Sequence, residues 1–171
     1  MYDALLAELT TPFRAMPVEV AALRLLAAVV LGGIIGLERE LASRAAGLRT
    51  HMLIALAACL FTLITFEMLA LPALAANADQ ADPLRLIEAV TAGVAFLAAG
   101  TIFTARGRVN GLTTGAGMWL AGAIGLACGI GMLPLAAIAT LLAVMILSVL
   151  VWIETRITRR KDKSEAEPDE R

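Results

Sequence analysis

The sequence RAAGLRT occupies residues 44–50, and a related sequence, RVNGLTT, occupies residues 108–114. Both copies share the pattern Arg-x-x-Gly-Leu-x-Thr, and both connect two long hydrophobic stretches. Gly36 and Gly100 precede the two copies at the same distance. An internal repeat of this kind predicts a membrane protein built from two similar helical hairpins, with its functional groups at the two connectors.

The composition indicates an integral membrane protein. Hydrophobic residues make up 60% of the 171 residues and charged residues only 17%, with a mean hydropathy of +0.83. A soluble domain of this composition would expose too much apolar surface. The hydrophobic stretches approach the length of about 20 residues that crosses a bilayer as a helix. We therefore predict an all-α integral membrane fold.

Five transmembrane helices are expected, since backbone groups in lipid must be bonded internally and these lengths suit helices. The first four helices would form two hairpins related as a parallel repeat, and the fifth has no counterpart. The expected helices span residues 18–37, 52–71, 86–103, 115–130 and 133–153. The expected organisation is an extracytoplasmic segment at 1–17, a transmembrane domain at 18–157 and a charged, disordered cytoplasmic tail at 158–171.

The positions of lysine and arginine predict the orientation. These residues gather at 39–49, at 106–108 and in the tail at 156–163, whereas the opposite side holds few of them. The positive-inside rule therefore places the C-terminus in the cytoplasm and the N-terminus outside. An odd number of helices requires the same result.

Two stripes of small residues predict close helix packing. Gly32 and Gly36 form a G-x-x-x-G pair in the first helix, and Gly117, Gly125 and Gly129 continue with Ala121 as a stripe in the fourth. Small residues let helix backbones approach each other closely. We interpret both stripes as packing within one chain; a homodimer interface is the alternative.

The end of the first helix is the first candidate site. Glu38 follows a long apolar stretch, and an ionisable group there needs a partner, for which Arg49, Arg108 and His51 are candidates. A salt-bridge network with one of these partners is the favoured interpretation of Glu38, and a bound ion or ligand is the alternative. Glu40 and Arg44 are spaced to pair on a helix surface.

Two predicted helix N-termini strengthen the case for an anion site. Thr50 is expected to cap the second helix, as Thr113 or Thr114 is expected to cap the fourth. Both helix dipoles would then direct partial positive charge at the cytoplasmic side, where a phosphate or a carboxylate of a partner would be favoured. His51 alone is weak evidence for a metal, so the metal ligands stay undetermined.

On the outer side, Asp82 is expected to cap the third helix, and Arg85 and Glu88 lie in its first turns. With Glu67 and Arg24 they are expected to satisfy each other's charges. The complete candidate set for ligand or partner binding is Glu38, Arg39, Arg44, Arg49, Thr50, His51, Asp82, Arg85, Arg108, Thr113 and Thr114.

No catalytic signature is present in the sequence. It has no Ser-His-Asp order, phosphate-binding loop, H-E-x-x-H or dinucleotide fingerprint, and its two cysteines do not form a C-x-x-C motif. We expect a non-enzymatic protein without a cofactor, embedded in the lipid bilayer and without a nucleic-acid partner.

The same residues resemble a known family. Residues 35–40 (IGLERE) and 46–53 (AGLRTHML) resemble the hallmark stretch of the MgtC/SapB membrane proteins. Asp82-Pro83-x-Arg85, the run from Gly93 to Gly100 and the GLTT at 111–114 continue the match in order. The resemblance covers about residues 20 to 153. Longer family members carry a soluble C-terminal domain, whose functions are not expected of residues 158–171.

The resemblance implies a bacterial inner-membrane protein with about five spanning helices and a role in adaptation to low magnesium, in some pathogens within host cells. It also implies a partner membrane protein, such as the ATP synthase. Our leading hypothesis is a regulator that acts through the cytoplasmic Arg/Thr/Glu cluster. The alternative is a small transporter or channel for magnesium or another cation, formed as a homodimer and lined by Glu38, Thr50 and Thr114.

Overall fold

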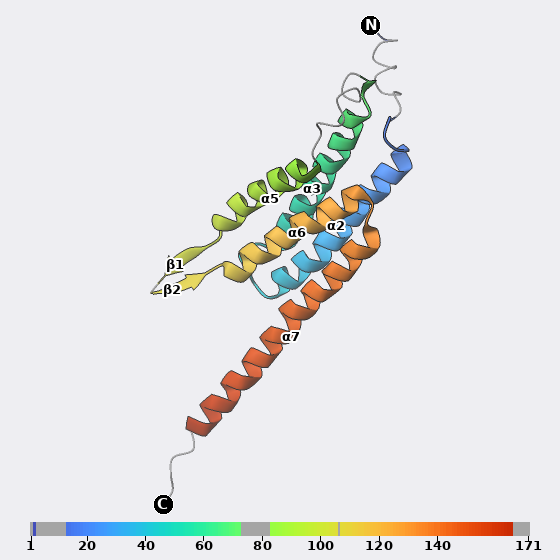
Figure 1. The fold of residues 1–171 in the computed structure, drawn as a ribbon. Coiled ribbons are helices and arrows are strands. Elements are labelled where there is room, and N and C mark those ends of the chain that lie inside the picture. The colour runs from blue at the N-terminus through green and yellow to red at the C-terminus, as the bar shows by residue number, and fades with distance from the viewer. Residues whose placement is uncertain (1, 3–12, 73–82, 106, 166–171) are drawn as a thin grey trace, which may run out of the picture.

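The structure, a computed structural model, describes residues 2, 13–72, 83–105 and 107–165, with the backbone alone for residues 83 and 150–165. The described residues form five long helices and a two-stranded hairpin (Figure 1). The helices are α2 (Val18–Leu41), α3 (Leu48–Leu69), α5 (Pro83–Ala99), α6 (Leu112–Ile130) and α7 (Leu133–Glu165). The strands are β1 (Phe103–Ala105) and β2 (Arg108–Asn110).

Helix length and composition support a membrane protein. Within the described residues, α2, α3 and α6 are long and apolar enough to cross a membrane. Helix α5 has 17 residues, and the apolar part of α7, Leu133–Val149, is also shorter than these three. The mainly helical membrane fold is therefore confirmed, while five membrane crossings stay a prediction.

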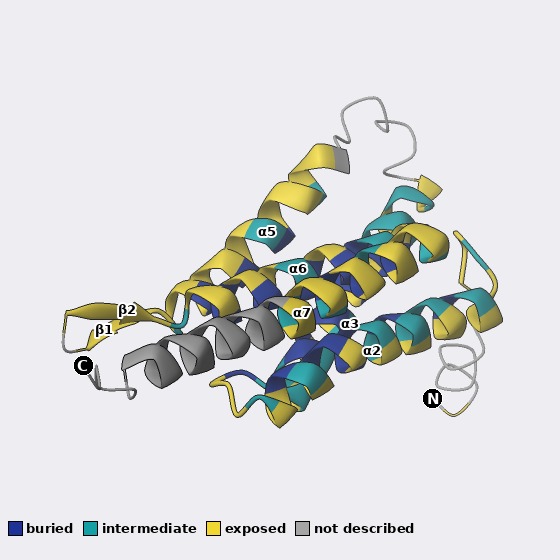
Figure 2. Cartoon of the chain, turned by 90° about the horizontal axis from the view of Figure 1, so that it is seen from below, coloured by how far each residue is buried: buried dark blue, intermediate teal, exposed yellow. Residues whose placement is uncertain are grey.

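Helix α3 is the centre of the packing. Helices α2 and α6 both pack closely against it, and α7 covers α2 and α6. Helix α5 packs mainly against α6 and touches α3 only lightly. Figure 2 shows the same order: buried residues gather where α2, α3 and α6 meet, and α5 is exposed over most of its length.

The glycine stripes make this close packing possible. A Cβ added at Gly32 of α2 would lie 2.7 Å from the Ala55 Cβ of α3, and one at Gly125 of α6 would overlap the Ala55 carbonyl oxygen. Gly129 meets Thr62 of α3 in the same way. Both stripes face α3, which confirms their interpretation as packing surfaces within one chain.

The two connectors lie at the same end of the bundle in both views (Figures 1 and 2). Helices α2 and α5 run toward this end, and α3 and α6 run away from it. The connectors differ in structure, because a loop joins α2 to α3 whereas the β1–β2 hairpin joins α5 to α6. The predicted helix at 86–103 was wrong at its end: α5 stops at Ala99.

Local sequence explains the element boundaries. Phe103, Thr104 and Val109 favour extended backbone, and Gly107 adopts a positive φ of 74° in the hairpin turn, where glycine is favoured. The strands are antiparallel, with Thr104 paired to Val109. Gly131 ends α6 at φ 96°, at the predicted break before the last helix. Helix α7 continues to Glu165, into the segment predicted to be disordered.

Candidate functional site

A buried ion pair anchors the connector end of α2. Arg39 is 1% exposed, and both its Nε and one terminal nitrogen donate to the carboxylate of Glu38, the latter bond at 2.8 Å. Two parallel bonds from one guanidinium to one carboxylate form a strong, oriented pair. The predicted partners of Glu38, namely Arg49, Arg108 or His51, were wrong, because its partner is the next residue, Arg39.

Glu40 holds the start of α3. Its carboxylate accepts a hydrogen bond from the backbone N–H of Leu48 at 3.1 Å. A Cβ at Gly47 would collide with that carboxylate, so only glycine leaves room for it. The expected Glu40–Arg44 pair is therefore absent, and Arg44 is exposed. The cap residue of α3, Gly47, has no side chain that could accept a hydrogen bond from the helix N-terminus. The Glu40 side chain of α2 accepts it instead.

Replacing Glu40 by alanine tests this contact. We expect the variant to lose about 1 kcal/mol of stability, as for a lost helix cap, since the Leu48 N–H then has only water as a partner. Denaturant unfolding in detergent, followed by circular dichroism, measures the change. Glu40→Gln keeps an acceptor oxygen and should lose less than half as much. Equal stability of Glu40→Ala and the unmodified protein would contradict the assignment.

The predicted threonine caps were wrong. The N-caps are Gly47 for α3 and Gly111 for α6, and neither helix has a side-chain bond from its cap residue. Gly111 has a φ of 87°, and a Cβ there would overlap the carbonyl oxygen of Thr101. The chain thus turns too tightly at Gly111 for any other residue. Of the threonines after it, Thr113 is exposed and Thr114 is buried.

His51 is completely buried between helices. Its Nδ1 lies 2.9 Å from the Gly47 carbonyl oxygen, which can only accept, so Nδ1 donates and Nε2 carries the lone pair. Nε2 has no hydrogen-bond partner, and a Cβ at Gly117 of α6 would lie 3.1 Å from it. The ring therefore fixes the spacing between α3 and α6. The described residues contain no group of three or more His, Cys, Asp or Glu side chains that could hold a metal ion.

The surface of the connector end is basic. Arg44 and Arg49 near the first connector and Arg108 in β2 are exposed, and none forms an ion pair with another described residue. The nearby carboxylates are engaged within the chain, Glu38 by Arg39 and Glu40 by Leu48. Unpaired guanidinium groups are thus what this end offers to a partner. This excess of unpaired arginines cannot be seen in the sequence, because the sequence does not show which acidic side chains already have partners within the chain.

The charges at the other end of the bundle do not form the predicted network. Glu67 accepts hydrogen bonds from the backbone N–H groups of Arg14 and Ala15, at 2.7 and 3.0 Å. Arg24 donates to the carbonyl oxygen of Gly129, at 2.7 Å, and so binds the last turn of α6. Arg85 and Glu88 are exposed, without an ion pair among the described residues. Asp82 lies outside the described residues.

These features define a helical membrane protein with a buried ion pair and a basic surface at one end of its bundle. A sequence profile described as the MgtC family matches residues 25–156. The chain belongs to this family. No solved structure matches it.

Relatives from three bacteria match most of this chain but only part of their own length. A Haemophilus influenzae protein is 37% identical and is matched over 82% of this chain and 61% of its own length. Protein MgtC of Brucella abortus is 36% identical, over 78% of this chain and 52% of its own. YhiD of Escherichia coli K12, named as a candidate magnesium transporter, is 33% identical, over 81% of this chain and 64% of its own length. The chain thus spans about half to two thirds of these relatives.

Proposed function

We propose that this magnesium-related membrane protein is a non-enzymatic regulator that binds an acidic partner membrane protein through Arg44 and Arg108. The observation that carries the proposal is the imbalance of free charge at the connectors. Both arginines are exposed and unpaired among the described residues, whereas Glu38 and Glu40 are engaged within the chain. Guanidinium groups bind carboxylates through paired hydrogen bonds, which gives direction as well as attraction.

The structure supports a fixed placement of Arg44. Its backbone N–H donates to the Arg39 carbonyl at 3.0 Å, directly after the buried ion pair. Arg108 pairs with Ala105 across the hairpin, at the same end of the bundle (Figure 1). Two connectors from different parts of the chain thus present one arginine each. A partner that contacts both would recognise the assembled bundle, and the ATP synthase is the candidate that the family resemblance implies.

A cation transporter is the second candidate, favoured by the name of the YhiD relative. A path for Mg²⁺ beside Glu38 would pass the buried Arg39 guanidinium, whose charge repels a cation. Within the bundle, the buried hydroxyls of Thr62 and Thr140 each donate to a carbonyl of their own helix, at 2.8 and 2.9 Å. They therefore pair within the chain instead of lining a path for a cation. For these reasons we propose the transporter only as the second candidate.

The experiment compares the double variant Arg44→Ala/Arg108→Ala with the unmodified protein. Each is tagged and expressed in the native bacterium, so that its natural partners are present in the membrane. We expect the double variant to lose most of the copurified ATP synthase and growth in low magnesium, at equal protein level. Arg85→Ala, an exposed arginine at the other end of the bundle, is the control and should change neither. Unchanged copurification would contradict the proposal. Saturable Mg²⁺ flux through proteoliposomes, lost in Glu38→Gln, would establish the transporter instead.

A further inference from the structure

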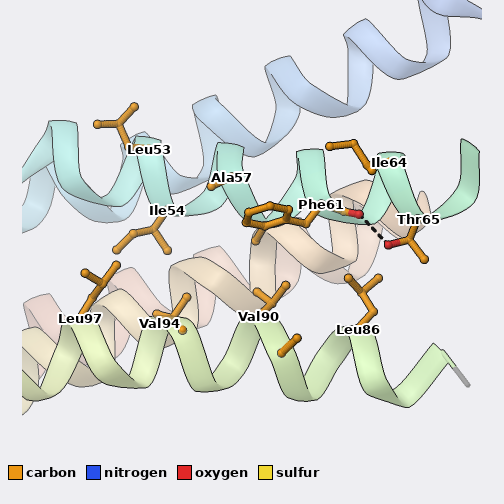
Figure 3. Close-up of a pocket in the computed structure, with 13 residues that line it drawn as sticks. Leu53, Ile54, Ala57, Phe61, Ile64, Thr65, Leu86, Val90, Val94 and Leu97 are labelled. Atoms are coloured by element: carbon orange, nitrogen blue, oxygen red, sulfur yellow. Dashed lines mark hydrogen bonds between the residues drawn. The ribbon is translucent and has the colours of Figure 1, made fainter. Parts of the chain in front are cut away.

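A groove runs between α3 and α5 on the outside of the packed core (Figure 3). It has a cavity volume of about 550 Å³, within the range of known ligand pockets. Its walls are apolar: Ile54 and Phe61 project from α3 toward α5, and Leu86 and Leu97 project from α5 toward α3. The hydroxyl of Thr65 is the one polar side-chain group among the residues that line it, and it donates to the Phe61 carbonyl at 2.9 Å.

The groove exists because α5 packs mainly on α6 and stays apart from α3. Gly93 lies on its α5 wall, and a Cβ added there would meet nothing within 4 Å. The small residue at this position is therefore not needed for packing within the chain, in contrast to Gly125. The space beside it is open to whatever surrounds the helices, and around a membrane protein that medium is lipid.

Size and length favour an acyl chain as the occupant. From Leu53 to Thr65 the groove follows α3 for about 18 Å, at 1.5 Å per residue. One leaflet contributes about half of the 30 Å hydrocarbon core, so the groove and a leaflet are similar in depth. A helix of this length and 10 Å diameter would occupy about 1,400 Å³, far more than the groove offers.

Charge favours an anionic headgroup at one end. Arg49 precedes Leu53 by one helical turn and so lies on the same face of α3. It is exposed and has no ion pair among the described residues. The groove thus continues from a free cation into an apolar channel, which is the order of headgroup and tail in a phospholipid. Basic residues at a membrane surface attract anionic lipids.

We propose that the α3–α5 groove binds one acyl chain of an anionic phospholipid, with its headgroup at Arg49. The lipid enters from the leaflet at the connector end and fills the space between the two helices. This site is independent of the proposed partner surface, because it uses neither Arg44 nor Arg108. Binding of lipid would hold α5 at a set distance from α3.

The headgroup is tested with the full chain purified in mild detergent. Native mass spectrometry measures retention of phosphatidylglycerol and phosphatidylcholine of equal chain length. We expect a preference for phosphatidylglycerol that falls about fivefold in Arg49→Gln, as for one basic residue at a lipid surface. Arg14→Gln, an exposed arginine at the opposite end of the bundle and outside the groove lining, should leave the preference unchanged. Equal retention of the two lipids, or a loss in Arg14→Gln alone, would overturn the proposal.

The tail is tested with phosphatidylglycerol that carries a photoreactive diazirine in its acyl chain. Cross-links are expected in the peptides that contain residues 53–65 and 86–97. Gly93→Leu fills the groove and should remove them, whereas Ala95→Leu, at an exposed position of α5 outside the groove lining, should not. The melting temperature of Gly93→Leu shows whether it is folded. Cross-links that persist in folded Gly93→Leu would overturn the assignment. So would a dimer in the native mass spectrum that Gly93→Leu converts to a monomer, because a second copy would then occupy the groove.

Discussion

Gly125→Ala is expected to lower the free energy of unfolding by about 3 kcal/mol, at the upper end of the range for overpacked cores. The added Cβ would overlap the Ala55 carbonyl oxygen and lie 2.8 Å from the Ala58 Cβ, on the face where α6 packs against α3. A backbone oxygen cannot turn aside as a side chain can, so one helix must shift. Thermal unfolding in detergent, followed by circular dichroism, measures the loss.

Gly93→Ala is the matched control for this prediction. It adds the same methyl group to a helix, at a position with nothing within 4 Å. Alanine is a better helix former than glycine by about 1 kcal/mol, so this variant should be as stable as the unmodified protein or more stable. Similar losses in both variants would show that the α3–α6 contact does not set the stability.

Arg39→Met is expected to cost about 3–5 kcal/mol, because it leaves Glu38 as a largely buried charge without its partner. The methionine fills part of the volume but supplies no donor for the carboxylate. The double variant Glu38→Gln/Arg39→Met removes both charges and should recover much of this loss. Thermal unfolding of the two single variants and the double variant completes a mutant cycle, which isolates the pair energy.

The control for Arg39→Met is Arg85→Met, which removes an exposed arginine without an ion pair among the described residues. Its effect should stay within about 0.5 kcal/mol, as for other surface substitutions. If Arg39→Met were no more destabilising than this control, the buried pair would not anchor α2. If the double variant were less stable than Arg39→Met, Glu38 would have another partner.

Much of the fold follows from the sequence, because hydrophobic length and small-residue spacing are local signals. The stripes at Gly32 and Gly125 predicted close packing, and both face α3. The hairpin at 103–110 was missed, since its apolar residues extend the hydrophobic stretch of the preceding helix. The glycine at position 107 was the sequence signal that could have indicated a turn here, and in the structure it has a positive φ.

The contacts of the connector residues could not be predicted from the sequence, and their role as a binding site stays a prediction. Polar groups were predicted at the connectors, and the structure has Glu38, Glu40 and His51 at the first of them. The predicted partners were wrong: helix spacing suggested Arg44 for Glu40, charge suggested distant partners for Glu38, and neither considered adjacent residues or backbone donors. Glu40 bonds the N–H of Leu48 across a loop, which no periodic pattern reports. Such contacts depend on how the chain turns at Gly47.

Ala55 lies between two glycines, Gly32 of α2 and Gly125 of α6. The first contact joins neighbouring helices and can form as soon as both have been synthesised. The second joins segments that are far apart in the chain, so it closes only after α6 has entered the membrane, and such non-local contacts form late in folding. Until then, the α6-facing side of α3 is covered by lipid. Formation of the α3–α6 contact therefore exchanges lipid for α6 along α3, before α7 packs on α2 and α6.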